Sequence, residues 1–146
     1  MTRLFTTGYQ GESIKEFINK LLASRINAIV DIRENPVSRK SGFSKNKLQK
    51  TLDSAGIDYY HFQELGTPKP LRNFLTDSQN YDKFFEEYSQ FLPEFQDALD
   101  DIVEIGSNNK RICLLCFEKD QEFCHRKIVA KVISLYTDKE IEVIHI

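Results

Sequence analysis

The chain has 146 residues, of which 40% are hydrophobic and 29% are charged, and its formal net charge is −2. These totals predict one folded domain over residues 1–146, exclude a disordered chain, and exclude nucleic-acid binding by bulk charge, although a local basic patch stays possible. The sequence has no apolar run of the roughly 20 residues that a bilayer span needs and no N-terminal signal peptide, so we expect a cytoplasmic protein without a membrane partner. Its three cysteines are then expected to be reduced thiols.

The first residues predict a strand, a loop and a helix. Leu4 to Thr7 is short and apolar, and it leads into a loop that begins with Gly8 and Tyr9. Ser13 to Glu16 has the pattern of a capping box and starts a helix with apolar residues at helical spacing. The arrangement resembles a phosphate-binding unit, but Gly-x-x-Gly is a weak signal and a tight turn is the simpler interpretation.

The second predicted strand, Ala28 to Ile32, carries ionisable groups at its carboxyl end. Asp31 is costly to bury unless it is paired, so a structural ion pair with Arg33 and a catalytic role are both open. The polar loop that follows contains the adjacent cations Arg39 and Lys40, which are suited to contact phosphate; a solvated loop is the alternative.

The middle of the chain predicts further alternation of helices and strands. Residues 44–56 form a helix with serine at its start and glycine at its end, and residues 57–62 form the third strand. Residues 63–79 are expected to be irregular because they contain two prolines and a glycine. Residues 81–106 have the spacing of helices with an aromatic and aliphatic core face, and residues 141–146 form a last strand.

The most informative stretch runs from residue 111 to residue 126. Ile112 to Phe117 is an unbroken apolar run, typical of a strand buried on both faces of a parallel sheet. Asp120 is placed to cap a helix that continues to about Tyr136. Strands that alternate with helices predict an α/β fold with three layers: a parallel or mostly parallel five-stranded sheet with helices on both faces. We expect the Rossmann-like strand order 3-2-1-4-5, which brings the ends of strands one and four together, where open α/β sheets place ligands.

Cys116, Glu118, Cys124, His125 and Arg126 would meet in that crevice, and their chemistry supports three interpretations. In the first, one cysteine is a nucleophile: Cys124 at a helix N-terminus beside two cationic groups, or Cys116 at a strand end. The Cys-x5-Arg loop of cysteine phosphatases is absent, because the sixth residue after Cys116 is a glutamate.

In the second interpretation both cysteines and His125, with or without His145, bind zinc. Their spacing matches no common zinc pattern, so we predict neither a metal nor another cofactor.

In the third, Arg33, Arg126 and the loop cations hold an anionic substrate while Asp31 or Glu118 exchanges protons with His125. Purely structural roles for the individual residues are the alternative, with Cys113 and Cys116 as small core residues, Glu118 paired with Arg126, and His125 at the surface.

A set of motifs spread over essentially the whole chain is shared with one family: Thr7-Gly-Tyr, Asp31-x-Arg33, Pro36, Ser38, Arg39, Phe43, Leu65-Gly66, Leu114-Leu-Cys-Phe-Glu118 and Cys124-His-Arg126. With these motifs the sequence resembles the domain-of-unknown-function 488 family. The resemblance implies a small cytosolic α/β protein, mostly bacterial or archaeal, with no established reaction. Two positions depart from the family pattern: Thr7 replaces the usual isoleucine, and Thr67 replaces a glycine, which makes a backbone contact to a ligand at that turn less certain.

The sequence therefore predicts an enzyme that acts on a phosphate-bearing substrate, a nucleotide or a nucleic-acid derivative, by acid–base or thiol chemistry at the carboxyl ends of the strands. The alternative is a binding module for nucleic acid or protein that uses the same basic crevice without turnover. An anionic small molecule or a nucleic acid is the expected partner in either case. The catalytic candidates are Asp31, Cys116, Glu118, Cys124 and His125, and the substrate-binding candidates are Gly8, Tyr9, Arg33, Arg39, Lys40 and Arg126.

Overall fold

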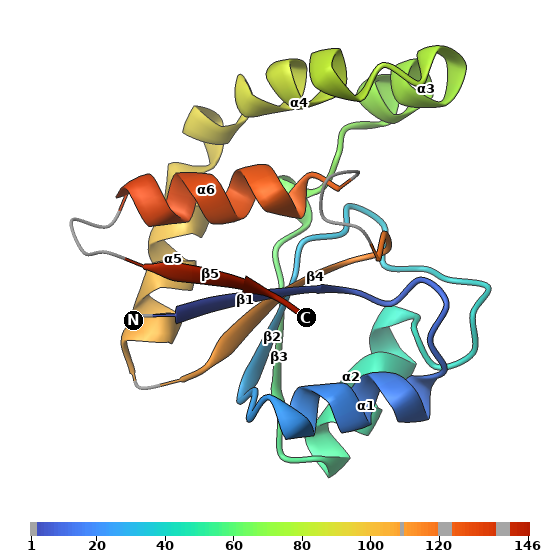
Figure 1. Ribbon diagram of the computed structural model, residues 1–146, viewed down its shortest axis with the longest axis vertical. Helices are drawn as coiled ribbons and strands as arrows, with labels where there is room; N and C mark the ends of the chain where they lie inside the picture. Colours follow the sequence, from blue (N-terminus) through green and yellow to red (C-terminus); the bar gives the residue numbers. More distant parts are fainter. Residues whose placement is uncertain (1–2, 109, 120–123, 137–140) are drawn as a thin grey trace.

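Strands and helices alternate along the chain in this computed structural model, which describes residues 3–108, 110–119, 124–136 and 141–146 (Figure 1). The described residues form one five-stranded sheet in which each paired neighbour runs parallel, as expected for an α/β fold. The strands are β1 (Arg3–Gly8), β2 (Ala28–Asp31), β3 (Asp58–His61), β4 (Ile112–Cys116) and β5 (Glu142–His145).

The strand order is β3-β2-β4-β1-β5, which differs from the expected order because β1 and β4 exchange places. All five residues of β4 are buried, whereas β5 is partly exposed. A strand that is apolar on both faces gains most from a central position, so β4 lies between β2 and β1 and the shorter β5 forms the edge. The ends of β1 and β4 still meet, with Gly8 level with Cys116.

Two separate apolar cores cover the two faces of the sheet. On one face, α1 (Ile14–Ala23) and α2 (Lys45–Ser54) pack against alternate strand residues such as Cys113 and Leu115. On the other face, α5 (Gln96–Ser107), α6 (Arg126–Tyr136) and α4 (Tyr81–Ser89) pack against residues such as Leu114 and Cys116. The helices therefore lie on both sides of the sheet, in three layers (Figure 1).

Local signals place the helix starts well, with one exception. Ser13 and Glu16 form both hydrogen bonds of the predicted capping box at the start of α1. Residues 63–79 are not irregular as expected, because they contain a short 3-10 turn η1 (Gln63–Leu65) and the helix α3 (Lys69–Ser78). Pro70 is compatible with this helix because it lies in the first turn, where its missing N–H costs no hydrogen bond.

A further 3-10 turn, η2 (Leu92–Phe95), which contains Pro93, directly precedes α5. The proposed cap Asp120 lies outside the described residues, and α6 begins at Arg126, so Cys124 and His125 directly precede the helix. Within the described part of the chain, no helix has the length and apolar character required to cross a bilayer.

Candidate functional site

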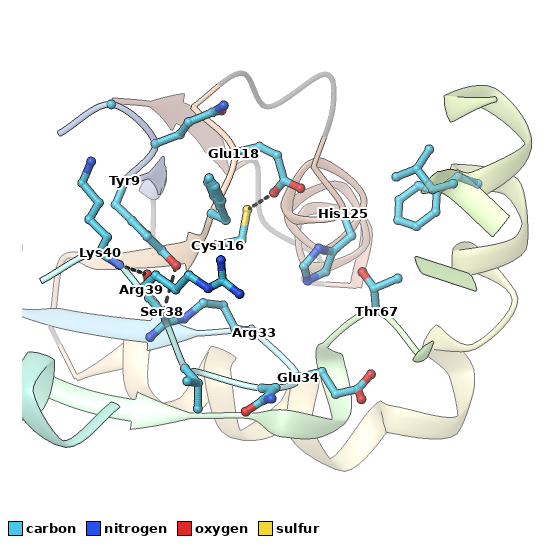
Figure 2. Close-up of a pocket in the computed structure, with 17 residues that line it drawn as sticks. Tyr9, Arg33, Glu34, Ser38, Arg39, Lys40, Thr67, Cys116, Glu118 and His125 are labelled. Carbon is cyan, nitrogen blue, oxygen red and sulfur yellow. Dashed lines mark hydrogen bonds between the residues drawn. The ribbon is translucent and has the colours of Figure 1, made fainter. Parts of the chain in front are cut away.

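A cavity of about 580 Å³ lies at the carboxyl ends of the central strands. Loops after β1, β2 and β4 form most of its wall, together with His125 and parts of α3 and α4. Figure 2 shows Arg39, Glu118 and His125 around the same hollow, although they come from different loops. The lining residues are Tyr9, Gln10, Gly11, Arg33, Glu34, Asn35, Val37, Ser38, Arg39, Lys40, Thr67, Leu75, Phe84, Cys116, Phe117, Glu118 and His125.

Asp31 lies beneath this cavity and forms a buried ion pair with Arg33. The Arg33 Nε and Nη2 atoms donate to the two Asp31 carboxylate oxygens at 2.9 and 2.8 Å, and the Tyr59 hydroxyl donates to Oδ2 at 2.5 Å. Asp31 is fully buried and does not line the cavity. Burial by itself would lower the pKa of the Arg33 guanidinium, but the hydrogen bonds and charge of Asp31 raise it overall. This geometry matches the structural ion pair that the sequence left open.

The remaining hydrogen bonds of Arg33 hold the cavity wall together. Its Nη1 atom donates to the Tyr9 hydroxyl at 3.2 Å and to the Phe43 carbonyl at 2.8 Å. The Tyr9 ring is buried and stacks between Phe43 and Phe117, with ring centroids 4.4 and 5.3 Å away. Arg33 and Tyr9 thus join the loops after β1, β2 and β4 into one rigid wall, and each exposes only a small part of its surface to the cavity.

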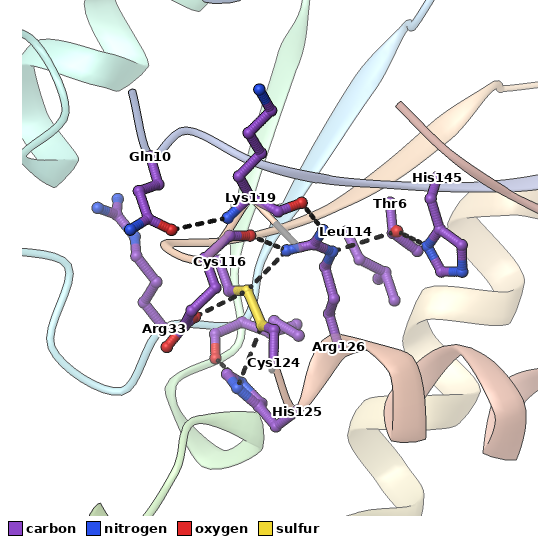
Figure 3. Close-up of a disulfide and its surroundings, with 12 residues drawn as sticks. Thr6, Gln10, Arg33, Leu114, Cys116, Lys119, Cys124, His125, Arg126 and His145 are labelled. Carbon is purple, nitrogen blue, oxygen red and sulfur yellow. Dashed lines mark hydrogen bonds between the residues drawn. A yellow bond between two sulfur atoms is a disulfide. The ribbon is translucent and has the colours of Figure 1, made fainter. Parts of the chain in front are cut away.

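Cys116 and Cys124 form a disulfide in the cavity wall (Figure 3), which differs from the predicted reduced thiols. The two residues lie in the same apolar core, and their Cα atoms are 7.3 Å apart. Cys113, the third cysteine, is a free thiol on the opposite face of β4, and burial raises its pKa to about 12. Only Cys116 and Cys124 therefore contribute sulfur chemistry near the cavity.

His125 is held in one tautomer by the end of β2. Its Nε2 atom lies 3.0 Å from the Ile32 carbonyl oxygen, which only accepts hydrogen bonds, so Nε2 carries the proton. Burial, reinforced by the positive charge of Arg126, lowers the pKa of the imidazole to about 4, and the ring is neutral at pH 7. The lone pair of Nδ1 therefore faces Cys124, whose Sγ atom is 3.8 Å away.

Glu118 supplies a carboxyl group to the cavity beside Cys116. Its Oε2 atom lies 3.5 Å from the Cys116 sulfur, and burial raises the pKa of the carboxyl above its usual value. A carboxyl group that ionises closer to neutral pH is better suited to take up and release protons. Glu118 is thus the described lining residue that best fits an acid–base role.

Arg126 is fully buried and does not line the cavity. Its guanidinium donates to the Thr6 hydroxyl at 3.2 Å, the Cys116 sulfur at 3.3 Å, the Lys119 carbonyl at 2.9 Å and the Glu118 carbonyl. These bonds fasten the loop after β4 to α6, and they place a positive charge next to Cys116. The sequence predicted that Arg126 contacts a substrate, but in the structure its guanidinium contacts protein groups.

Gly8 is likewise placed for packing. A Cβ atom at this position would lie 1.6 Å from the Glu118 carbonyl oxygen, so only glycine allows β1 and the loop after β4 to approach so closely.

The predicted cations Arg39 and Lys40 do line the cavity. Glu34, Ser38 and Thr67 also line it and were not predicted as site residues, although the position of Glu34 directly after Arg33 placed it at a strand end.

Three donor atoms in this wall could hold a metal. The sulfur atoms of Cys116 and Cys124 and a ring nitrogen of His125 all lie within 4.8 Å of one another, and all three residues are buried. His145, which the sequence offered as a further ligand, lies on the other side of Arg126 and hydrogen-bonds through Nδ1 with the Thr6 hydroxyl (Figure 3).

Comparison with known proteins identifies a family but no characterised relative. Neither the curated proteins nor the solved structures include a match to this chain. The family described as "Domain of unknown function DUF488" matches residues 13–133 of the 146. This region runs from the start of the first helix into α6 and contains every motif of the cavity except the loop after β1. The chain therefore belongs to the DUF488 family.

Proposed function

We propose that this protein is an enzyme that acts on a phosphate-bearing substrate, with Glu118 as the group that exchanges protons. The observation that supports this most directly is the composition of the cavity, where a cationic loop lies opposite a carboxyl group with a raised pKa. Arg39 and Lys40 would bind the phosphate, since two adjacent cations that line the cavity suit charge-assisted hydrogen bonds to its oxygens. The ion pair of Arg33 with Asp31 leaves these two residues as the principal cations for an anion.

The roles within this enzyme follow from the contacts. Glu118 faces the cavity beside Cys116, so a proton can pass between the carboxyl group and a substrate atom bound there. Asp31 and Arg126 act as positioning residues, because their polar atoms contact protein groups beneath the cavity. A nucleotide or a short piece of nucleic acid is the substrate class that joins phosphate to a larger apolar group, which Tyr9, Phe117 and Phe84 in the lining would contact.

The test measures thermal stability against a panel of nucleotides and short oligonucleotides, followed by mass spectrometry for turnover. A ligand at 100 times its dissociation constant stabilises the protein by about 2.7 kcal/mol, which a melting curve detects easily. We expect the shift to disappear in the double variant Arg39→Ala/Lys40→Ala. The matched control Lys15→Ala/Lys131→Ala removes the same charge from exposed helix positions and should keep it. Glu118→Gln should bind the ligand but lose turnover; full turnover in that variant would refute the assigned role.

A second candidate function, a nucleic-acid binding module, is favoured by one further observation. A second groove of about 660 Å³ shares Arg39 and Lys40 with the cavity, adds Lys45 and Lys47, and has no carboxylate among its lining residues. Four phosphate contacts to a single strand would give a salt dependence of about −3 in log K against log salt. Binding with that slope, unaffected by Glu118→Gln and without turnover, would favour the module over the enzyme.

A further inference from the structure

The two cysteines and the histidine in the cavity wall have no role in the proton transfer proposed above. We propose that, once the disulfide is reduced, Cys116, Cys124 and His125 bind a divalent metal of the zinc class whose fourth coordination position opens into the cavity beside Glu118. The metal site does not depend on the proposed function. Only the further step, in which a metal-bound water would react with the substrate, rests on that function.

The histidine is already arranged as a ligand. With Nε2–H bonded to the Ile32 carbonyl, the ring presents the lone pair of Nδ1 to the sulfur of Cys124. Metal-bound histidines usually donate their second ring N–H to a carbonyl or a carboxylate, which fixes the ring orientation. The β2 end therefore supplies the outer contact that a zinc ligand of this kind requires.

Cys124 and His125 have the donor spacing of two ligands on one tetrahedral ion, and the backbone spacing of the two cysteines leaves room for their sulfurs to separate. With metal–sulfur and metal–nitrogen bonds of about 2.3 and 2.0 Å at a tetrahedral angle, sulfur and nitrogen ligands are separated by about 3.5 Å. The Cys124 sulfur and His125 Nδ1 are 3.8 Å apart. The Cα atoms of Cys116 and Cys124 are 7.3 Å apart, and half-cystines usually lie within about 4.4–6.8 Å. The backbone thus already has the wider spacing that two separated thiolates on one ion can use.

Charge in the wall also favours thiolates. Two thiolates and a divalent ion are neutral together, and the guanidinium of Arg126 donates to the Cys116 sulfur at 3.3 Å. A positive group next to a thiol lowers the cost of removing its proton. Arg126 does not line the cavity, but its charge next to Cys116 would make it a positioning residue for the metal site.

One side of the three-donor set faces the cavity. Cys116 and His125 line it and Cys124 does not, so an ion among them would have its free position toward the cavity and Glu118. Three protein ligands and one open position describe catalytic rather than structural zinc. Two thiolates, one imidazole and a separate glutamate as proton carrier are also the groups that zinc-dependent deaminases use.

The hydrolysis that such a site would support is balanced in protons. A metal-bound water passes one proton to the Glu118 carboxylate, and the remaining hydroxide forms a bond to the electrophilic atom of the substrate. The bond to the leaving group then breaks, and the leaving group takes the proton from Glu118. The sum is one water consumed, with no oxidant or reductant required.

Oxidation and metal binding compete for the same sulfur atoms. Metal binding to the reduced form releases two protons, one from each thiol, and forms two metal–sulfur bonds. Diamide takes two electrons and two protons from the thiols, becomes the corresponding hydrazine and leaves the disulfide, which offers no thiolate to the ion. The disulfide in the structure described here corresponds to that oxidised arrangement.

The experiment titrates the reduced, chelator-treated full chain with cobalt(II), which reports its ligands by absorption. We expect saturation at one ion per chain, with a thiolate-to-cobalt charge-transfer band and intense visible bands of tetrahedral cobalt, all removed by zinc. Cys116→Ser, Cys124→Ser and His125→Gln should each weaken binding at least tenfold. Cys113→Ala is the matched control, since its thiol lies on the opposite face of the same strand, and it should bind cobalt like the wild type.

Several outcomes would overturn the metal site. They are a cobalt spectrum without the charge-transfer band, equal binding after diamide oxidation, and unchanged binding in the folded Cys116→Ser and Cys124→Ser variants, with folding checked by circular dichroism. The Arg39→Ala/Lys40→Ala variant separates the two proposals, because it should bind cobalt normally while losing the response to nucleotides. Loss of cobalt binding with retained nucleotide binding would refute the metal site alone.

Discussion

Asp31 and Arg33 are two residues apart in the chain, and their side chains pair in charge and through two hydrogen bonds. The Asp31 carboxylate also accepts from the Arg33 backbone N–H at 3.1 Å, so this pair closes the end of β2. His61 on the neighbouring strand lies with Nε2 2.7 Å from the Arg33 carbonyl oxygen and extends the same network. A buried pair of this kind is costly to break, because the remaining charge has no partner.

Replacing Asp31 should therefore destabilise the fold strongly. We expect Asp31→Ala to lower the free energy of unfolding by about 3–5 kcal/mol, since Arg33 would be left buried and uncompensated. The exposed pair of Arg3 with Glu142, at 3.3 Å, provides the comparison, and Glu142→Ala should cost about 1 kcal/mol or less. Urea denaturation of both variants measures the difference, and similar losses would show that the buried pair is not structural.

A second prediction for a single residue concerns the close packing of Gly8. Gly8→Ala should displace the loop after β4, because the added methyl group would overlap the Glu118 carbonyl. We expect a loss of about 1–3 kcal/mol in unfolding free energy together with loss of cobalt binding and of the nucleotide response. Gly56→Ala is the control: its φ of +76° also disfavours alanine, but no atom lies within 4 Å of the new Cβ. That variant should lose about 1–2 kcal/mol and keep both responses.

The element that behaves most as its local sequence predicts is α1. Its start is determined by Ser13 and Glu16, which exchange hydrogen bonds across three residues and need no contact from elsewhere. The start of α2 shows the opposite case. Ser44 precedes that helix as predicted, but its hydroxyl accepts from the Ser38 N–H at 3.0 Å and donates to the Ser38 carbonyl instead of capping the helix.

The capping box of α1 predicts a pH dependence of stability. Hydrogen bonding from the Ser13 backbone, followed by the Ser13 side chain, lowers the pKa of Glu16 below its ordinary value near 4.5. The folded state therefore favours the carboxylate, and this contribution is present above pH 4.5 and lost as pH falls through the lower folded pKa. Thermal unfolding of the wild type and Glu16→Gln should differ at pH 7 and converge as pH falls below the folded pKa of Glu16; a difference that does not change with pH would contradict the assignment.

Within the whole molecule, β4 is the strand on which the others depend. It pairs with both β1 and β2, and its side chains enter both cores, whereas β5 has one neighbour. The loops that form the cavity leave the ends of these central strands. The Gln10 N–H donates to the Phe117 carbonyl at 2.9 Å, and the Lys119 N–H to the Gln10 side chain at 3.2 Å. The position of β4 thus determines the shape of the cavity.

This arrangement predicts unequal costs for similar truncations. Leu114→Ala in β4 should lower the free energy of unfolding by about 2–5 kcal/mol, because it opens space in a fully buried core. Val143→Ala in the edge strand β5 removes a partly buried side chain and should cost clearly less. Guanidinium denaturation measures both losses of unfolding free energy, and equal losses would show that β4 does not contribute more to stability than β5.

Several of these features were predictable from the sequence, and the limit is set by distance along the chain. The α/β class, the three layers and the capping box follow from apolar periodicity and from residues within one or two turns of each other. The grouping of Cys116, Glu118 and His125 at one cavity was expected because they flank the end of one buried strand. The helix α3 was missed because Pro68 and Pro70 indicated a loop, although Pro68 precedes the helix and Pro70 lies in its first turn, where proline is tolerated.

The sequence by itself determined the strands, most of the helices and which chemical groups lie near the carboxyl ends of the strands. Only the tertiary structure decided that β4 lies between β2 and β1, that the thiols of Cys116 and Cys124 meet, and that Arg126 turns into the protein. Its guanidinium reaches Thr6, 120 residues earlier in the chain. Contacts between such distant residues depend on how buried surfaces fit together, and no local pattern of residues specifies that fit.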